Sequence, residues 1–225
     1  MEVYEALPDD DAKGAVIVIQ EAFGVNEHIR DVTRRMAAEG YHAVAPALFH
    51  RAGGGTAPYD DFSKVMPLFE GMSDTGTTTD IDAVLEYLHG AGWSNSQVGL
   101  VGFCMGGRVS FLAAARRELG AVVGFYGGGI VTSRRPQLPP LIGEAATLKA
   151  PWLGLFGDQD EGIPVEDVEK LRTALEAASA PTEIVRYPTA GHGFLCAERD
   201  SYNEAAAKDG WARTVDWFGA HLAPA

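Results

Sequence analysis

The sequence predicts an α/β fold in which a doubly wound, mostly parallel sheet carries helices on both faces, forming a three-layer αβα sandwich. Short apolar runs, which are typical of buried strands, alternate along the chain with stretches whose apolar residues recur at helical spacing. The strand candidates cover residues 15–19, 42–46, 97–101, 121–125, 151–157 and 183–188. Alternating strands and helices indicate parallel strands that are joined by helical crossovers.

The helix candidates lie between these strands, and each has apolar residues on one face. The first follows Asn26, a favourable N-cap residue, and stops at Gly40. The others end near residue 90, begin after residue 104, cover residues 164–177 and surround residues 211–222. No composition shift or internal repeat divides the 225 residues, so we expect one domain over residues 1–225.

The most informative stretch is Gly-Phe-Cys-Met-Gly at residues 102–106, between a strand candidate and a helix candidate. This is the pattern of the nucleophile elbow of the α/β-hydrolase fold, with cysteine in place of the usual serine. The turn forces the nucleophile into a strained backbone, and only glycines allow strand and helix to approach so closely. A lone cysteine is often just a small buried hydrophobe. The prediction that Cys104 is a nucleophile therefore depends on its partners.

Candidate partners follow in the chain order of α/β-hydrolases, which is nucleophile, then acid, then histidine. Asp158 and Asp160 come directly after one strand candidate, and His192 lies between two glycines after the next. A loop histidine is commonly only solvated, but residues after successive parallel strands meet at one edge of the sheet. His192 would act as the base, and an aspartate would orient it. Spacing alone does not separate the two acids.

The oxyanion hole would use two backbone N–H groups. One belongs to Met105, the residue after the nucleophile, and the other to Ala22, in the loop after the first apolar strand candidate. Glu21 precedes it, and a carboxylate there would repel the negative charge that the site must stabilise. By residue type alone, Glu21 is most simply a surface acid.

Four segments together resemble the dienelactone hydrolase family: residues 20–26, 98–107, 157–164 and 190–194. The resemblance extends from about residue 15 to about residue 218, with the motifs in matching order. It implies a Cys104–His192–Asp160 triad that hydrolyses a small carboxylic ester or lactone through a thioester, as a carboxymethylenebutenolidase does. It also implies that Glu21 takes or holds the proton of the resting thiol.

The chain departs from the family pattern where the family holds a substrate carboxylate with arginines. One arginine is expected four residues after the catalytic histidine, where this chain has Cys196. The other is expected before the elbow, but residues 52–76 contain no arginine. Arg199, or Arg134 or Arg135 in a later loop, could serve instead.

Two further residues are candidates for the substrate site. Tyr126 comes directly after a strand candidate, and Phe194 follows the histidine motif. Loops of the length of residues 47–76 and 126–150 are usually functional in a compact domain. We therefore expect Tyr126, Phe194 and Arg199 to bind substrate, and both loops to form walls of the site.

Composition limits the partners. A net charge of −13 argues against nucleic acid and anionic membranes, both of which need a basic surface. No signal peptide or apolar stretch of membrane-spanning length is evident, and two cysteines form no disulfide framework, so we expect a cytoplasmic protein. The histidines are scattered, and we expect neither a metal nor another cofactor.

The sequence thus predicts a cysteine-dependent hydrolase whose partner is a small ester or lactone. A general esterase or thioesterase of the same fold is one alternative. A non-catalytic ligand-binding module is another, because a fold does not guarantee chemistry.

Overall fold

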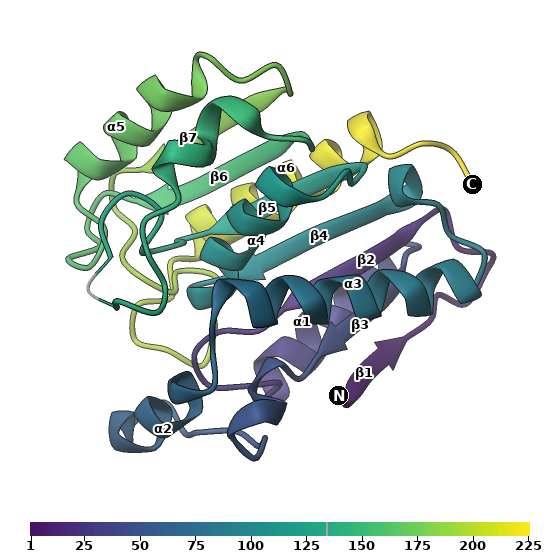
Figure 1. Ribbon diagram of the computed structural model, residues 1–225, viewed down its shortest axis with the longest axis horizontal. Coiled ribbons are helices and arrows are strands. Elements are labelled where there is room, and N and C mark those ends of the chain that lie inside the picture. Colours follow the sequence, from purple (N-terminus) through teal and green to yellow (C-terminus); the bar gives the residue numbers. More distant parts are fainter. Residues whose placement is uncertain (134) are drawn as a thin grey trace.

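The predicted doubly wound, mostly parallel sheet is confirmed in the computed structural model, which describes residues 1–133 and 135–225. Seven strands lie in the order β1-β3-β2-β4-β5-β6-β7, and only β1 runs antiparallel to its neighbour. The strands are β1 (Val3–Ala6), β2 (Ala15–Ile19), β3 (His42–Pro46), β4 (Val98–Phe103), β5 (Ala121–Phe125), β6 (Trp152–Gly157) and β7 (Thr182–Tyr187). Figure 1 shows the right-handed twist that such a sheet accumulates.

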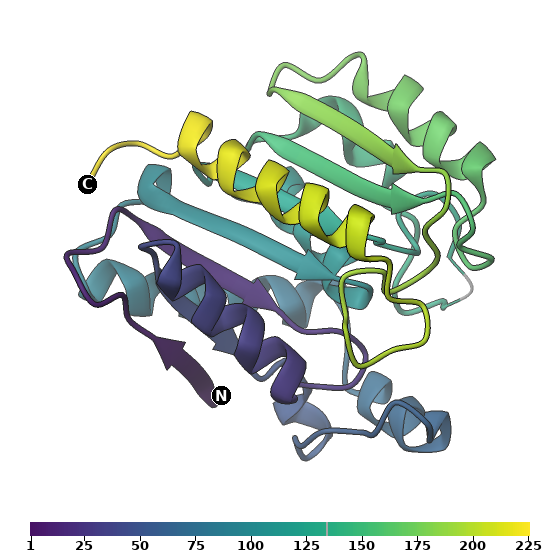
Figure 2. The same ribbon diagram turned by 180° about the vertical axis from the view of Figure 1, so that it is seen from behind.

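Helices cover both faces of the sheet. In the described chain they are α1 (Glu27–Ala38), α2 (Val65–Glu70), α3 (Asp74–Gly90), α4 (Met105–Arg116), α5 (Val165–Leu175) and α6 (Glu204–His221). Short 3₁₀ helices are η1 (Leu48–Ala52), η2 (Phe62–Lys64), η3 (Asn95–Gln97) and η4 (Ile142–Thr147). In Figure 1, α3, α4 and α5 lie in front of the sheet, and Figure 2 shows α1 and α6 on the opposite face.

The local patterns explain these elements. Strands β2 to β6 are buried along their whole length, which is why they are continuous apolar runs without alternation. Helix α1 begins where the Asn26 side chain accepts a hydrogen bond from the Ile29 N–H group, and it buries Ile29, Val32 and Met36 against the sheet. The amphipathic pattern thus fixes which side of each helix faces the core.

Within the described ranges, no helix combines the length and the apolar composition needed to cross a bilayer. The carboxyl ends of the six parallel strands meet at one edge of the sheet. The two segments that we expected to be long loops follow β3 and β5, and they contain the short helices η1, η2, α2 and η4. They therefore approach the same edge as the predicted catalytic residues.

Candidate active site

Cys104 occupies the sharp turn between β4 and α4. Its backbone has φ 55° and ψ −114°, a left-handed region that non-glycine residues rarely adopt. The flanking glycines are required sterically. A Cβ atom on Gly102 would collide with the Gly106 carbonyl, and one on Gly106 would lie 2.5 Å from the Ile19 carbonyl oxygen. The turn places the thiol at the amino terminus of α4, where the helix dipole favours a negative charge.

Asp160 and His192 come together from the loops after β6 and β7. The distance from His192 Nδ1 to Asp160 Oδ2 is 2.6 Å, and Asp160 Oδ1 accepts a hydrogen bond of 2.8 Å from the Gly162 N–H group. The carboxylate of Asp160 is almost completely buried, whereas His192 is partly exposed. Because both oxygens of Asp160 have partners, the carboxylate has one orientation, and it fixes that of the imidazole.

The rival acid is engaged elsewhere. Asp158 accepts two hydrogen bonds from the Arg186 guanidinium, at 2.7 and 2.8 Å. Arg186 belongs to β7, so this pair joins the end of β6 to its neighbouring strand. The structure therefore separates the two aspartates that spacing left open, and Asp160 is the one that contacts His192.

The electrostatics of His192 favour its protonated form. Burial alone lowers the pKa of this imidazolium, but the adjacent Cys104 thiolate and the Asp160 carboxylate raise it to about 10. His192 is therefore protonated at neutral pH beside the Cys104 sulfur. An imidazolium beside a thiolate is the reactive form of a cysteine nucleophile.

Glu21 is completely buried, contrary to its simplest interpretation as a surface acid. Its Oε2 accepts a hydrogen bond of 3.2 Å from the Tyr59 hydroxyl, and its Oε1 lies 3.6 Å from Arg199 Nη1. Burial raises the pKa of Glu21, while Arg199 and His192 oppose that shift. Burial thus makes this carboxyl take up a proton more readily than an exposed glutamate does.

The Glu21 carboxyl and two neighbouring side chains form a cluster of the residue types that bind metals. Donor atoms of Glu21, His28 and Cys196 lie within 4.8 Å of one another, and all three residues are buried. The positive charge of Arg199 beside Glu21 disfavours a cation there. The Cys196 thiol instead donates a hydrogen bond of 3.4 Å to the Tyr59 hydroxyl.

A cavity of about 440 Å³ lies beside Cys104 and His192. The part of the cavity next to the thiol is lined by Cys104, His192, Ala22 and Met105. The N–H group of Met105, in the first turn of α4, has no acceptor within its helix. Both residues that we predicted for the oxyanion hole thus lie on the cavity wall beside the thiol.

The rest of the cavity lining includes two segments that we call its far walls. One contributes Phe62 and Phe69 and the other contributes Leu138 and Arg135, of which only Arg135 was among our candidates for the substrate site. The guanidinium of Arg135 stacks on the Phe69 ring at 4.1 Å, and among the described residues no carboxylate lies within ion-pair distance of it. An unpaired cation beside apolar rings was not evident from any local motif, because it depends on two loops meeting.

The three predicted substrate-binding residues lie elsewhere. Tyr126 and Phe194 are fully buried and pack against each other with a ring separation of 5.1 Å, and neither lines the cavity. Arg199 lies beside Glu21 rather than on the cavity wall. Tyr126 comes directly after β5, as expected, but its ring and that of Phe194 lie in the packed core beneath the site. Arg134 lies outside the described residues.

The sheet order, the strained elbow and the cavity beside it are those of the α/β-hydrolase fold. The sequence profile of the dienelactone hydrolase family matches residues 1–222. A protein of Salmonella typhimurium named "Putative carboxymethylenebutenolidase" is 44% identical over 97% of this chain and 82% of its own. The carboxymethylenebutenolidase of Pseudomonas putida is 31% identical over 90% and 84%.

A solved structure agrees with these sequences. The crystal structure titled "Putative Dienelactone Hydrolase" from Klebsiella pneumoniae is 41% identical, covers 96% of this chain and 92% of its own, and has a TM-score of 0.86. The chain therefore belongs to the dienelactone hydrolase family. The predictions of the family, of the fold and of a carboxylic ester hydrolase are thereby confirmed.

Proposed function

We propose that the protein hydrolyses a small carboxylic ester or lactone with Cys104 as nucleophile, His192 as base and acid, and Asp160 as the group that orients His192. The observation that carries the proposal is the 2.6 Å contact between Asp160 and His192 beside Cys104, with Cys104 and His192 both lining the cavity. The raised pKa of His192 supports it, because the imidazolium is matched to a thiolate.

In the proposed reaction the Cys104 sulfur attacks the acyl carbon, and the carbonyl π electrons move to its oxygen. The N–H groups of Ala22 and Met105 stabilise that oxyanion. The tetrahedral intermediate collapses as the C–O bond to the alcohol or enol breaks, and His192 gives its proton to that leaving oxygen. Water, deprotonated by His192, then attacks the thioester and releases the acid and the thiolate.

Glu21 has a separate proposed role, which is to accept or hold the proton of the resting Cys104 thiol. Its complete burial and the resulting raised pKa support this role, because such a carboxyl takes up a proton more readily than an exposed glutamate does. The family resemblance implies the same role.

For the substrate we propose a lactone or ester that carries a carboxylate, because named relatives are carboxymethylenebutenolidases. Arg135 is the best placed cation, since it lines the cavity without a carboxylate partner in the described chain. Arg199 is already beside the Glu21 carboxylate, which favours Arg135 over it for this task.

The test compares cis- and trans-dienelactone with p-nitrophenyl acetate, using the wild type, Cys104→Ala and the matched control Cys196→Ala. We expect dienelactone to be cleaved faster than the acetate, Cys104→Ala to be inactive on both, and Cys196→Ala to remain active. Full activity of Cys104→Ala would reject the proposed nucleophile.

A general esterase is the second candidate function. One specific observation favours it, which is the buried Cys196 at the position where the family resemblance implies an arginine. This second candidate replaces the first if Arg135→Gln leaves the KM for dienelactone unchanged and the wild type cleaves neutral esters as fast as dienelactone. A rise in KM for dienelactone alone would support the carboxylate-bearing substrate.

A further inference from the structure

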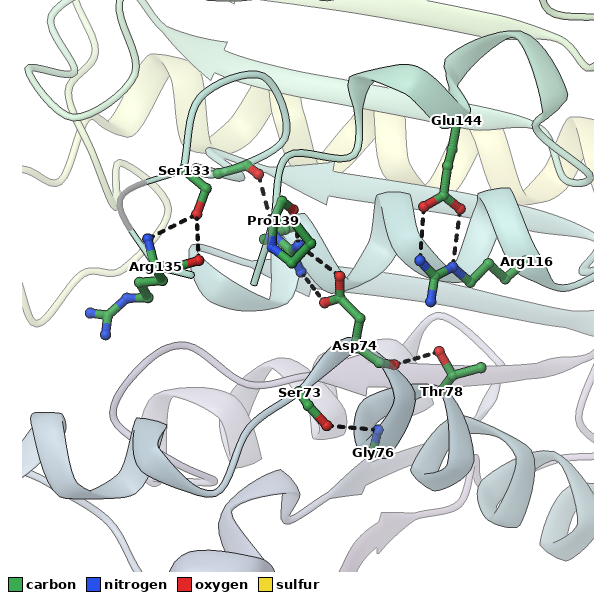
Figure 3. A network of polar contacts seen from close by, with 11 residues as sticks. Ser73, Asp74, Gly76, Thr78, Arg116, Ser133, Arg135, Pro139 and Glu144 are labelled. Atoms are coloured by element: carbon green, nitrogen blue, oxygen red, sulfur yellow. Dashed lines mark hydrogen bonds and ion pairs between the residues drawn. The ribbon is translucent and has the colours of Figure 1, made fainter. Parts of the chain in front are cut away.

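Arg108 lies one helical turn after Cys104 and is almost fully buried, yet it lines the cavity. Its Nη1 and Nη2 atoms donate to the two carboxylate oxygens of Asp74, at 2.6 and 3.0 Å. Nε donates to the Gly129 carbonyl at 3.3 Å, and Nη2 also donates to the Pro139 carbonyl at 2.5 Å. Figure 3 shows Asp74 and Pro139 converging from different segments of the chain.

These contacts join the nucleophile helix to both far walls of the cavity. Asp74 is the first residue of α3 and follows the α2 segment that contributes Phe69. Gly129 and Pro139 stand at the two ends of the loop that contributes Arg135 and Leu138. The Arg108 guanidinium therefore fixes the positions of both segments relative to Cys104.

Stability alone does not account for this arrangement. Replacing a buried ion pair by apolar residues of similar volume is often neutral or stabilising, because the desolvation cost of both charges disappears. An apolar pair could not, however, donate the hydrogen bonds that Arg108 gives to the carbonyl groups of Gly129 and Pro139 in a separate loop. The planar fork of arginine matches several acceptors at once, which lysine does not.

We propose that Arg108 is a positioning residue that sets the spacing between the two far walls, and thereby the preference for esters large enough to touch both. The proposal rests on the proposed function, because it assumes that the ester reacts at Cys104.

The same helix provides a matched control. Arg116 lies two turns further along α4 and forms a similar two-bond pair with Glu144, at 2.8 and 3.0 Å (Figure 3). Both partners are about one-third exposed, and neither lines the cavity. A general loosening of α4 would follow from loss of either pair, but a change in wall spacing follows only from loss of Arg108.

The experiment measures kcat and KM for p-nitrophenyl hexanoate and p-nitrophenyl acetate in Arg108→Met/Asp74→Leu and in Arg116→Met/Glu144→Leu. We expect the hexanoate-to-acetate ratio of kcat/KM to fall about tenfold in the first variant, mainly through KM, since misplacement of a wall affects only substrates that reach it. In the control the ratio should stay within about twofold.

An unchanged ratio in Arg108→Met/Asp74→Leu would overturn the proposal, and so would an equal fall in the control. Arg108→Lys provides a second variant if the double variant does not fold. It keeps the charge beside Asp74 but loses the fork, so the ratio should fall by a smaller factor. Cys104→Ala is assayed in parallel: its activity would reject the nucleophile, whereas its inactivity with an unchanged ratio would reject only the role of Arg108.

Discussion

Asp160 and Glu21 are both buried carboxyl groups at the same edge of the sheet, but the protein holds them differently. Both oxygens of Asp160 accept hydrogen bonds, from His192 and from the Gly162 N–H group. Among the described residues, Glu21 Oε1 has no hydrogen-bond partner, and its nearest cation, on Arg199, is 3.6 Å away. A fully bonded carboxylate suits orientation, whereas a half-bonded one with a raised pKa suits proton exchange.

The most severe way to break this comparison is Asp160→Asn. The amide keeps the shape of the side chain but removes the charge that stabilises the imidazolium and selects its tautomer. We expect kcat/KM to fall about 10³-fold, as is typical when the orienting acid of a triad is lost. Steady-state kinetics on an activated ester measure this effect. A fall of less than tenfold would show that Asp160 does not orient the base.

Glu21→Gln should have a smaller effect. The amide keeps most contacts of the side chain but cannot take up the thiol proton, and we expect a loss of about 10- to 100-fold in kcat/KM, in the range of general acid–base contributions. The rate of Cys104 alkylation by iodoacetamide should fall in parallel. Wild-type alkylation and turnover in this variant would limit Glu21 to a structural role.

The pH profile distinguishes the two carboxyl groups further. Because the pKa of His192 is raised to about 10, protonated His192 persists through neutral pH, and activity should fall only as pH rises through about 10. Asp160→Asn should move this alkaline limb to lower pH, since one of the groups that raises the pKa is gone. Glu21→Gln should move it by less and in the same direction, because Glu21 and His192 attract each other but Glu21 is not among the main causes of the raised His192 pKa. An alkaline limb near pH 6.5 in the wild type would contradict the assigned ion pair.

His28, which lies close to Glu21, should affect how stability depends on pH. Burial lowers the pKa of His28 to about 4, so the unfolded chain binds a proton that the folded chain excludes between pH 6.5 and 4. Stability from this group is complete above pH 6.5 and is lost as pH falls toward 4, by up to about 3 kcal/mol. Urea unfolding of His28→Leu across this range should show a weaker acid dependence than the wild type. Identical slopes would mean that His28 is solvated when folded.

Asp158→Asn should have the smallest effect. The pair that Asp158 forms with Arg186 is partly exposed and neither residue lines the cavity, so its loss should cost about 1 kcal/mol of stability or less. We expect kcat/KM to stay within about twofold of the wild type. A loss as large as that of Asp160→Asn would mean that the two aspartates share the orienting role.

Features that follow from backbone geometry could mostly be predicted from the sequence. The elbow at Cys104 needs glycines at fixed positions, and parallel strands bring the residues that follow them to one edge, so the approach of Asp160 to His192 was predictable. The choice between Asp160 and Asp158 was not, because it depends on Arg186 in another strand. Strand β1 was also missed, since an edge strand with half-exposed residues has no continuous apolar run.

Side chains that depend on loop packing were the least predictable. Tyr126 and Phe194 follow strands in the expected way, but their rings fill the core, while Phe69 and Arg135 reach the cavity from segments far apart in the sequence. The position of a residue in a predicted loop does not indicate which residues of other loops its side chain will contact. The burial of Glu21 was likewise hidden, because its partners Tyr59 and Arg199 come from two other loops.

The most direct test of the central claim is to trap the acyl group on the enzyme. His192→Gln is mixed with p-nitrophenyl acetate, and the acetylated peptide is identified by mass spectrometry after acid quenching. The account predicts one acetyl group on Cys104, which persists because the base for thioester hydrolysis is missing, and none on Cys196. An acetyl group on another residue, or continued turnover without any acetyl-enzyme in Cys104→Ala, would contradict it.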